Sequence, residues 1–450
     1  MKPNRPLMTS EEDVDCEPDS GLTSISIMEK LVKEVVKKAQ GTSSRTIQSE
    51  DIQAGASKNA PSNLGKKRGF ALPGIDDLSK EQEDARALPK KGQHLIIGGP
   101  GTGKSVLALL RSRRHYQDKN DYVFLVFNHL LNQASRQLFG DGLASEQWQA
   151  WFMRTFTRLT KSPMPKLPPS KTGWQDIDWN SVATIIAELP PPETTDRPSL
   201  IIDEGQDMPP GFYQALAGLG FENFYVVADQ NQQIVPGQNS TRQDIQNNLA
   251  IEPLMVVELQ DNYRNTYPVA RLAREFYTGD PASPPPELPS RPSKICPLLY
   301  DYAQDVFEKI IERILKNADN HPNKLFGVIT PDNIVRLRYY EALLASDVQL
   351  DNGQPRIETY KAGASPLLPF NEGGIMVINA QSCKGLEFDT VFLADINQYF
   401  FDPKNPDKAK RLFYVMIARA KEHVIMLKEA GKHCPVEAIL PNDMNILERK

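Results

Sequence analysis

The sequence has few of the residues that mark secreted or metal-binding proteins. It contains four cysteines and six histidines in 450 residues, and the cysteines (Cys16, Cys296, Cys383 and Cys434) are far apart. This spacing fits neither a disulfide framework nor a metal site. No apolar run approaches the roughly 18 residues of a membrane span, and the polar N-terminal stretch lacks a secretory apolar segment. We therefore expect a cytoplasmic protein without a structural metal and without membrane contact.

A strong excess of basic charge is also missing, because the formal net charge is −5. This value argues against a protein that coats nucleic acid non-specifically, and it confines any nucleic-acid surface to a local groove. It does not exclude a motor that grips a strand transiently. Hydrophobic residues make up 40% of the chain and charged residues 24%, as in soluble globular proteins. The length allows two or three domains.

One glycine-rich stretch carries the strongest chemical signal. It follows an apolar run at Leu95–Ile97 and precedes apolar residues at helical spacing, and it fits the phosphate-loop pattern that ends in Gly-Lys-Ser. A strand, a glycine loop and a helix N-terminus together direct backbone N–H groups at an anion. Lys104 would contact the β- and γ-phosphates, and the Ser105 hydroxyl would hold Mg²⁺. The candidate nucleotide-binding residues are Gly98, Gly99, Pro100, Gly101, Thr102, Gly103, Lys104 and Ser105.

Polar side chains outside this loop complete a candidate nucleoside triphosphate site. Asp203 and Glu204 follow the apolar strand Leu200–Ile202, and ligands of parallel sheets lie at the carboxyl ends of strands. Asp203 is a candidate Mg²⁺ ligand, and Glu204 is the candidate base that orients and deprotonates water. Gln232, after another apolar strand, is the candidate sensor of the γ-phosphate. Gln82 precedes the loop, and its amide can read the adenine edge.

The chain divides into three parts by composition. Residues 1–70 form an acidic and polar extension that we expect to be flexible, with one amphipathic helix at Ile27–Ala39 that either docks a protein partner or packs on the rest. We interpret Lys66–Arg68 as a solvated charge run. Residues 71–253 and 254–450 alternate strands with helices, which predicts an α/β fold of two parallel-sheet domains. Within the first domain we expect a strand over residues 151–157.

Seven stretches in order resemble the motor core of UvrD/Rep-type superfamily 1 helicases, over Leu78 to about Leu427. They are Gln82, Gly98–Ser105, Asp203–Asp207, Asp229–Ile234, Asn262–Thr266, Lys384–Phe388 and Arg411–Ala420. The resemblance implies two RecA-like domains of the P-loop NTPase class. These would bind ATP and Mg²⁺ in the cleft between them and step along single-stranded DNA with 3′→5′ polarity.

The resemblance also implies roles for individual residues. Tyr263 is similar to a tyrosine that stacks on adenine, and Glu387 to an acid that meets the ribose. Arg264 and Arg419 resemble two arginines that reach the γ-phosphate from the second domain, where planar cations stabilise the charge of phosphoryl transfer. The residues that match positions in contact with nucleic acid are Phe127, Asn128, Thr155 and Phe156.

The chain departs from the family pattern at several positions, including Gln381, Ala418 and Ala228, and in the length of two intervals. Val235-Pro236-Gly237 stands where the family usually has an aromatic residue that stacks on a base. The intervals from Thr157 to Asp203 and from Arg264 to Lys384 are too short for large accessory domains. We predict an ATP hydrolase that acts as a minimal single-strand DNA translocase or helicase. The alternative is an ATP-gated, nucleic-acid-binding switch subunit of a larger complex, such as a nuclease or defence complex, and an RNA track stays open.

Overall fold

A computed structural model describes residues 66–69, 72–74, 77–169, 175–190, 197–232, 239–278, 285–360 and 368–450. The helix expected at Ile27–Ala39 lies outside these residues. The described residues belong to one compact unit, Pro61–Lys450. None of the helices that the structure describes is both long and apolar enough to cross a membrane.

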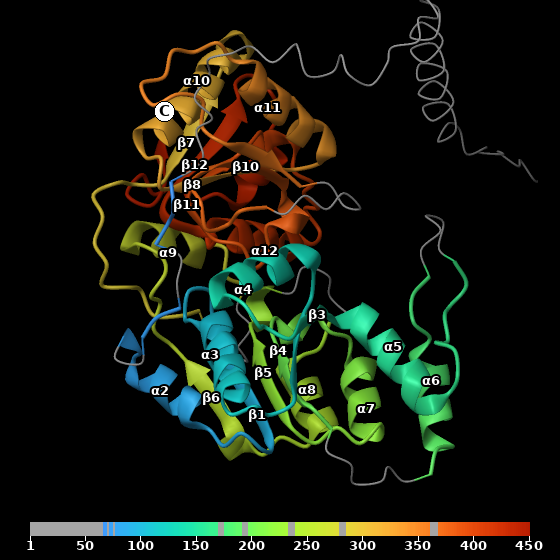
Figure 1. Ribbon diagram of the computed structural model, residues 1–450. Helices are drawn as coiled ribbons and strands as arrows, with labels where there is room; N and C mark the ends of the chain where they lie inside the picture. Colours follow the sequence, from blue (N-terminus) through green and yellow to red (C-terminus); the bar gives the residue numbers. More distant parts are fainter. Residues whose placement is uncertain are drawn as a thin grey trace, which may run out of the picture. The chain divides into compact units, whose positions relative to one another are not determined.

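The described part of the chain holds two parallel sheets (Figure 1). The first has the strand order β3-β2-β4-β5-β1-β6. Every neighbouring pair is parallel, with Ile96 of β1 aligned with Val227 of β5 and Val257 of β6. Its strands are β1 (Gln93–Gly98), β2 (Tyr122–Val126), β3 (Ser145–Gln147), β4 (Ser199–Ile202), β5 (Phe224–Ala228) and β6 (Val256–Leu259).

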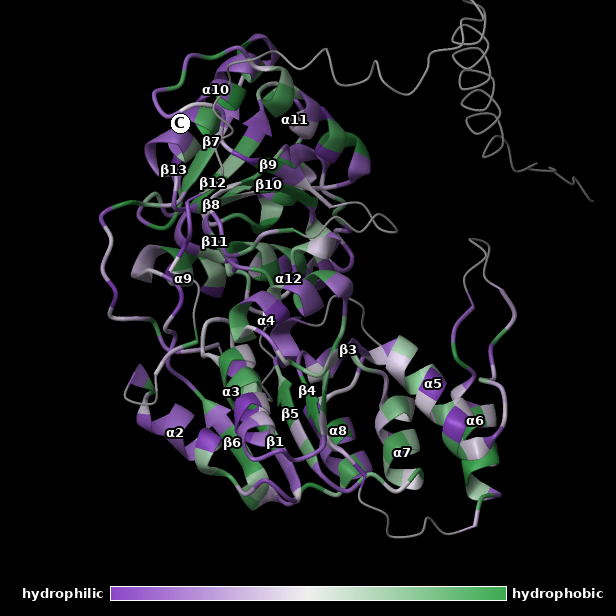
Figure 2. Cartoon of the chain, in the orientation of Figure 1, coloured by the Kyte–Doolittle hydropathy of each residue, from purple (hydrophilic) through white to green (hydrophobic). Residues whose placement is uncertain are grey.

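Helices cover both faces of the first sheet, because alternate strand residues point to opposite sides. Ile96, Ile201 and Val227 lie in the core under α2, α3 and α4, whereas their neighbours Leu95, Ile202 and Val226 lie in the core under α5, α6, α7 and α8. The central strands are accordingly hydrophobic in Figure 2. The helices are α2 (Lys80–Ala87), α3 (Lys104–Gln117), α4 (His129–Phe139), α5 (Trp148–Thr160), α6 (Trp179–Ala187), α7 (Pro210–Gly218) and α8 (Arg242–Leu249). This sheet and its helices, residues 77–259, are the first lobe.

The second sheet has the order β13-β7-β12-β11-β8-β10-β9, again parallel throughout. Helices α9 and α12 pack on one face and α10 and α11 on the other. Its strands are β7 (Leu298–Tyr302), β8 (Leu325–Thr330), β9 (Ile357–Thr359), β10 (Gly374–Asn379), β11 (Phe388–Leu393), β12 (Ala420–Glu429) and β13 (Glu448–Arg449). Its helices are α9 (Tyr267–Arg274), α10 (Phe307–Asn320), α11 (Asn333–Ala345) and α12 (Pro406–Ile417). Residues 267–450 are the second lobe.

The expected α/β fold with two parallel sheets is confirmed, but three local predictions differ from the structure. Residues 151–157 lie within helix α5 rather than in a strand, because Trp148, Phe152 and Phe156 recur every four residues and share one buried helix face. The domain boundary after residue 253 is too early, since β6 pairs with β1 in the first sheet. Arg68 is also not a solvated charge, because it pairs with Asp389 of β11.

The two lobes pack directly on each other through α4. Leu130 of this helix belongs to the apolar core of the second lobe. About two helical turns further along α4, the Gln137 amide donates to the Leu368 carbonyl (2.6 Å) and accepts from the Phe370 N–H (2.7 Å). The carboxyl ends of the first sheet therefore face the second lobe.

The buried position of Phe156 generates a prediction about stability. Phe156→Ala should lower the free energy of unfolding by about 3–5 kcal/mol, because it leaves a cavity in the core. Phe127→Ala makes the same change at a side chain that is 38% exposed, so we expect a loss below about 1 kcal/mol. Urea unfolding of the two variants measures the difference, and equal losses would contradict the assignment of Phe156 to the core.

Candidate active site

The glycine-rich loop lies between β1 and α3, at the edge of the sheet that faces the second lobe. Gly101 and Gly103 adopt left-handed φ values of 81° and 89°, which favour glycine. A Cβ on Gly103 would lie 2.5 Å from Nε2 of Gln82, so the close approach also requires glycine. Helix α3 begins at the next residue, Lys104, and its free N–H groups face the loop. The local geometry is therefore that of an anion cradle.

The Gln82 amide supports this loop. Its Nε2 donates to the Thr102 carbonyl (3.0 Å), and its Oε1 accepts from the Ser79 N–H (3.1 Å) within the capping box of α2. Gln82 lines the cavity described below, yet both ends of its amide already have protein partners. The structure thus adds a supporting role to the expected contact with adenine.

Two carboxylates follow β4 and lie in different surroundings. Oδ1 of Asp203 accepts from the Ser105 hydroxyl (3.1 Å), while Oδ2 is buried and has no hydrogen-bond partner among the described residues. Burial, and then the neighbouring charge of Glu204, raise the pKa of Asp203 to about 7. A hydroxyl beside a carboxylate with one unpaired oxygen fits Mg²⁺, which prefers oxygen ligands. No group of three or more His, Cys, Asp or Glu side chains that could hold a metal exists within the described ranges.

Glu204 stands in a left-handed backbone conformation (φ 53°), which a non-glycine residue adopts at a cost. Its Oε2 accepts a hydrogen bond from the Gln206 amide (2.6 Å). Burial by itself would raise the pKa of Glu204, but Lys384, Lys104 and Arg419 outweigh burial and lower it. The carboxylate is therefore ionised at neutral pH, as a general base must be.

The Lys104 ammonium lies on the loop itself. Its Nζ donates to the Gly99 carbonyl (2.8 Å) and lies 3.6 Å from Oδ2 of Asp229, at the end of β5. Burial lowers the pKa of Lys104, and Asp229 opposes that change. The ammonium is thus available at the mouth of the anion cradle.

Gln232 connects Asp229 to the second lobe. Its Nε2 donates to Oδ2 of Asp229 (2.6 Å), and its Oε1 accepts from Nη2 of Arg419 (2.7 Å). Arg419 follows α12 and is almost wholly buried, and its Nε donates to the Val415 carbonyl (3.0 Å). A single amide therefore joins the neighbour of Lys104 to a guanidinium of the other lobe.

Lys384 makes a second connection that the sequence analysis did not assign. Its Nζ donates to Oδ1 of Asp207 (2.6 Å) and to the Gln232 carbonyl (2.7 Å), and both charged side chains are buried. Burial raises the pKa of Asp207 to about 6, although Lys384 opposes that rise. The only sequence signal for this pair is that each residue stands in a helicase-like motif, at Lys384–Phe388 and Asp203–Asp207.

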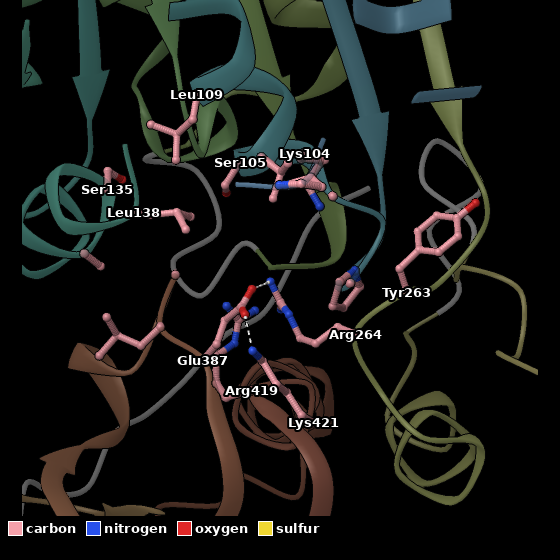
Figure 3. A pocket seen from close by; sticks show the side chains of 18 of the residues that line it. Lys104, Ser105, Leu109, Ser135, Leu138, Tyr263, Arg264, Glu387, Arg419 and Lys421 are labelled. Carbon is pink, nitrogen blue, oxygen red and sulfur yellow. Dashed lines mark hydrogen bonds and ion pairs between the residues drawn. The ribbon is translucent and has the colours of Figure 1, made fainter. Parts of the chain in front are cut away.

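Arg264 lies in the connector between the lobes, residues 260–266. Its guanidinium pairs with Glu387, which also lies 3.3 Å from Nζ of Lys421 (Figure 3). Burial would raise the pKa of Glu387, but the two cations lower it to about 2. The connector is held to the phosphate loop by the Tyr263 N–H, which donates to the Gly101 carbonyl (2.8 Å).

One cavity of about 380 Å³ between the lobes is lined by several of these groups, namely Gln82, Lys104, Ser105, Glu204, Gln232, Arg264, Glu387, Arg419 and Lys421. Figure 3 shows Lys104, Ser105, Arg264, Glu387 and Arg419 around it, with Tyr263 to one side. Its charged lining residues are Arg68, Asp77, Lys104, Glu204, Arg264, Arg291, Glu387, Arg419 and Lys421, in which cations outnumber acids. The cavity is thus suited to a polyanion, with groups supplied by both lobes and the connector.

Residues 374–427 match the family described as the UvrD-like helicase C-terminal domain. This segment of the second lobe is therefore similar to that domain family. Arg419 and Lys384 both lie in this segment, and the resemblance to UvrD-like helicases is confirmed there.

Other comparisons add less. No curated protein matches the chain. Among solved structures, the C-terminal domain of a possible DNA helicase from Lactobacillus plantarum WCFS1 is 14% identical, with a TM-score of 0.30, and the match covers 41% of this chain and 97% of that one. A TM-score of this size does not establish a shared fold.

The expected nucleotide residues separate into those that line the cavity and those that do not. Gln82, Pro100, Gly101, Gly103, Lys104, Ser105, Glu204, Gln232, Tyr263, Arg264, Glu387 and Arg419 line the cavity. Gly98, Gly99, Thr102 and Asp203 do not line it, although Asp203 contacts Ser105. Gly99 lies against Pro286, where a Cβ would meet Cδ at 2.3 Å.

The expected nucleic-acid residues do not gather at one surface. Phe127 is partly exposed, and the side chain of Asn128 caps α4 by accepting from the Leu131 N–H (2.8 Å). Thr155 and Phe156 are buried in α5, so their assignment to a strand-binding surface is wrong. The side chain of Gln147, at the end of β3, donates to the Phe127 carbonyl (3.3 Å). The Val235–Gly237 stretch lies outside the described residues.

The buried Lys384–Asp207 pair generates a pH-dependent prediction. Lys384→Met should destabilise the protein by about 3–5 kcal/mol at pH 7, because the Asp207 carboxylate loses its counter-ion. Because burial raises the pKa of Asp207, the folded protein favours its protonated, neutral form, which needs no counter-ion. The loss of stability should therefore shrink as the pH falls from 7 to 5 and Asp207 takes up a proton. Thermal unfolding across that range measures it. Adding Asp207→Asn to the variant should restore most of the stability at pH 7, and a pH-independent loss would contradict the role of the pair.

Proposed function

We propose that this protein hydrolyses ATP in the cavity between its lobes and uses the reaction to move along single-stranded nucleic acid. The observation that carries the proposal is that Lys104, Glu204 and Arg419 line one cavity although they come from both lobes. The order of elements around the first sheet further supports a RecA-like P-loop NTPase, because the loop, the carboxylates and Asp229 all follow parallel strands at one edge.

In the proposed reaction, the α3 N-terminus and Lys104 bind the phosphates. Mg²⁺, held by Ser105 and Asp203, would neutralise charge on the phosphate oxygens. The ionised Glu204 accepts a proton from the attacking water. Arg264 and Arg419 stabilise the charge that develops on the transferred phosphoryl group.

Movement would follow from the bridge at Gln232. Its amide contacts Asp229 on one side and Arg419 on the other, so a γ-phosphate beside it would compete for both contacts. The arrangement of the lobes would then differ between the triphosphate and diphosphate states, which is the requirement for coupling hydrolysis to a step. Tyr263 is half exposed at the cavity and available to stack on a base.

We propose single-stranded DNA as the track because residues 374–427 match the UvrD-like helicase C-terminal domain family. The proposed 3′→5′ polarity rests on the family resemblance alone. The partly exposed Phe127, which directly follows β2, stays a candidate for a contact with the strand. The alternative function, an ATP-gated switch in a larger complex, is favoured by the firm resting contacts between the lobes. Tight nucleotide binding without strand-stimulated turnover would support the switch.

The first functional prediction concerns turnover. Single-stranded DNA should stimulate ATP hydrolysis, and Lys104→Ala should lower kcat by about 10²-fold or more, because a preorganised phosphate contact is lost. Phosphate release with single-stranded DNA, duplex DNA and RNA oligonucleotides measures the effect and ranks the tracks. Absence of stimulation by every oligonucleotide would contradict the motor, and a Lys104→Ala enzyme that keeps most turnover would contradict the site.

The second functional prediction separates catalysis from binding. Arg264→Ala should lower kcat by about 10³-fold while it changes nucleotide affinity much less, because the guanidinium acts chiefly on the transition state. Arg158→Ala, at an exposed position on α5, is the matched control and should retain wild-type kcat. If Arg264→Ala raised the KM for ATP and left kcat unchanged, Arg264 would be a binding residue only.

A further inference from the structure

The segment before α2 contacts both lobes beside the nucleotide cavity. The Arg68 N–H donates to the Asn371 carbonyl (2.9 Å), and the Gly373 N–H donates to the Lys66 carbonyl (3.0 Å). Lys67 forms an antiparallel bridge with Glu372. These backbone pairs attach residues 66–68 to the segment that leads into β10 of the second lobe.

The Arg68 side chain reinforces this attachment. Nη2 of Arg68 lies 2.9 Å from Oδ2 of Asp389, and Nη1 donates to the Phe370 carbonyl (3.1 Å). The guanidinium is 5% exposed, so solvent screens the pair little. Asp389 also accepts from the Leu325 N–H (2.8 Å) of β8 and stands two residues after Glu387. Arg68 is therefore anchored to the second sheet close to Glu387, which lines the cavity.

The same segment enters the first lobe four residues later. Leu72 packs against the apolar cluster under α2, α3 and α4. Further along, the Gly74 N–H donates to Oδ2 of Asp77, and Ser79 caps α2. Arg68, Gly69, Pro73 and Asp77 line the cavity. Residues 66–69 and 72–74 are therefore attached to different lobes, and both ranges supply residues that line the proposed nucleotide site.

Covalent geometry converts these two anchors into a limit on movement. Four residues of fully extended chain span at most about 14 Å, whatever path they take between Arg68 and Leu72. The lobes are already joined by the connector at residues 260–266, so this segment is a second link at the cavity. Two covalent links restrict separation of the lobes more than one link does. Rotation about a hinge in the connector would stretch the segment between Arg68 and Leu72.

We propose that the covalent link between the anchors Arg68 and Leu72 is a tether that limits how far the lobes separate at the nucleotide cavity, and that Arg68 is its positioning residue. The inference rests on the proposed function, because the quantity that the tether controls is release of nucleotide. Opening of the lobes is the step that frees product in many enzymes that close around a substrate. A shorter link between the lobes therefore predicts slower release of the nucleotide.

The experiment measures dissociation of methylanthraniloyl-ADP with Mg²⁺ by stopped flow, without nucleic acid. Arg68→Ala should raise the dissociation rate about fivefold, at the low end of typical couplings between sites. Arg68→Lys keeps the charge and should fall between that variant and wild type. Lys67→Ala is the matched control, because it removes an exposed charge from the same segment and leaves its backbone pairs intact, so its rate should equal that of wild type.

An insertion separates the tether from a merely stabilising role. Eight Gly and Ser residues placed after Gly69 keep both anchors but lengthen the link, so release should again accelerate about fivefold. A wild-type rate in this variant would overturn the tether even if Arg68→Ala released faster. Failure of the wild-type protein to bind the analogue would instead contradict the proposed function, and the tether with it.

Discussion

The contact on which the molecule most depends is the one between Gln232 and its two partners. This amide accepts a hydrogen bond from the Arg419 guanidinium of the second lobe and donates one to Asp229. The Asp229 carboxylate lies 3.6 Å from the Lys104 ammonium. Each group is buried, and a buried polar group without a partner is costly, so the three side chains are held as a unit. Removing Gln232 would take one partner from Asp229 and one from Arg419 at the boundary of the two lobes.

Lys384 and Asp207 add charge to this boundary and explain why the lobes meet so closely. A buried ion pair seldom adds much stability compared with apolar packing, but it strongly disfavours arrangements that separate its members. Here one member comes from each lobe, and the lysine also binds the Gln232 carbonyl. The pair therefore favours one docking of the second lobe on the first, while the cavity beside it keeps the charged groups that suit the proposed nucleotide.

Several features could be predicted from the sequence because their causes are local. The loop at Gly98–Ser105 is specified by its glycines, because Gly101 and Gly103 adopt backbone angles that favour glycine, and the strands at Leu95–Ile97 and Leu200–Ile202 are specified by continuous apolar runs. The segment around Trp151 is ambiguous from its sequence alone, because a short run of aromatic residues suits a strand or a buried helix equally well. Its helical period shows only once Trp148, which starts α5, is included.

By itself the sequence determined the two parallel α/β sheets and the chemistry at the ends of individual strands, since apolar period and loop composition act over a few neighbouring residues. Only the tertiary structure decided which of these ends face each other. It brought Arg68 to Asp389, Lys384 to Asp207 and Arg419 to Gln232, across separations of well over a hundred residues. Such pairs depend on how whole layers pack, and no local pattern of residues encodes the partner of a buried charge.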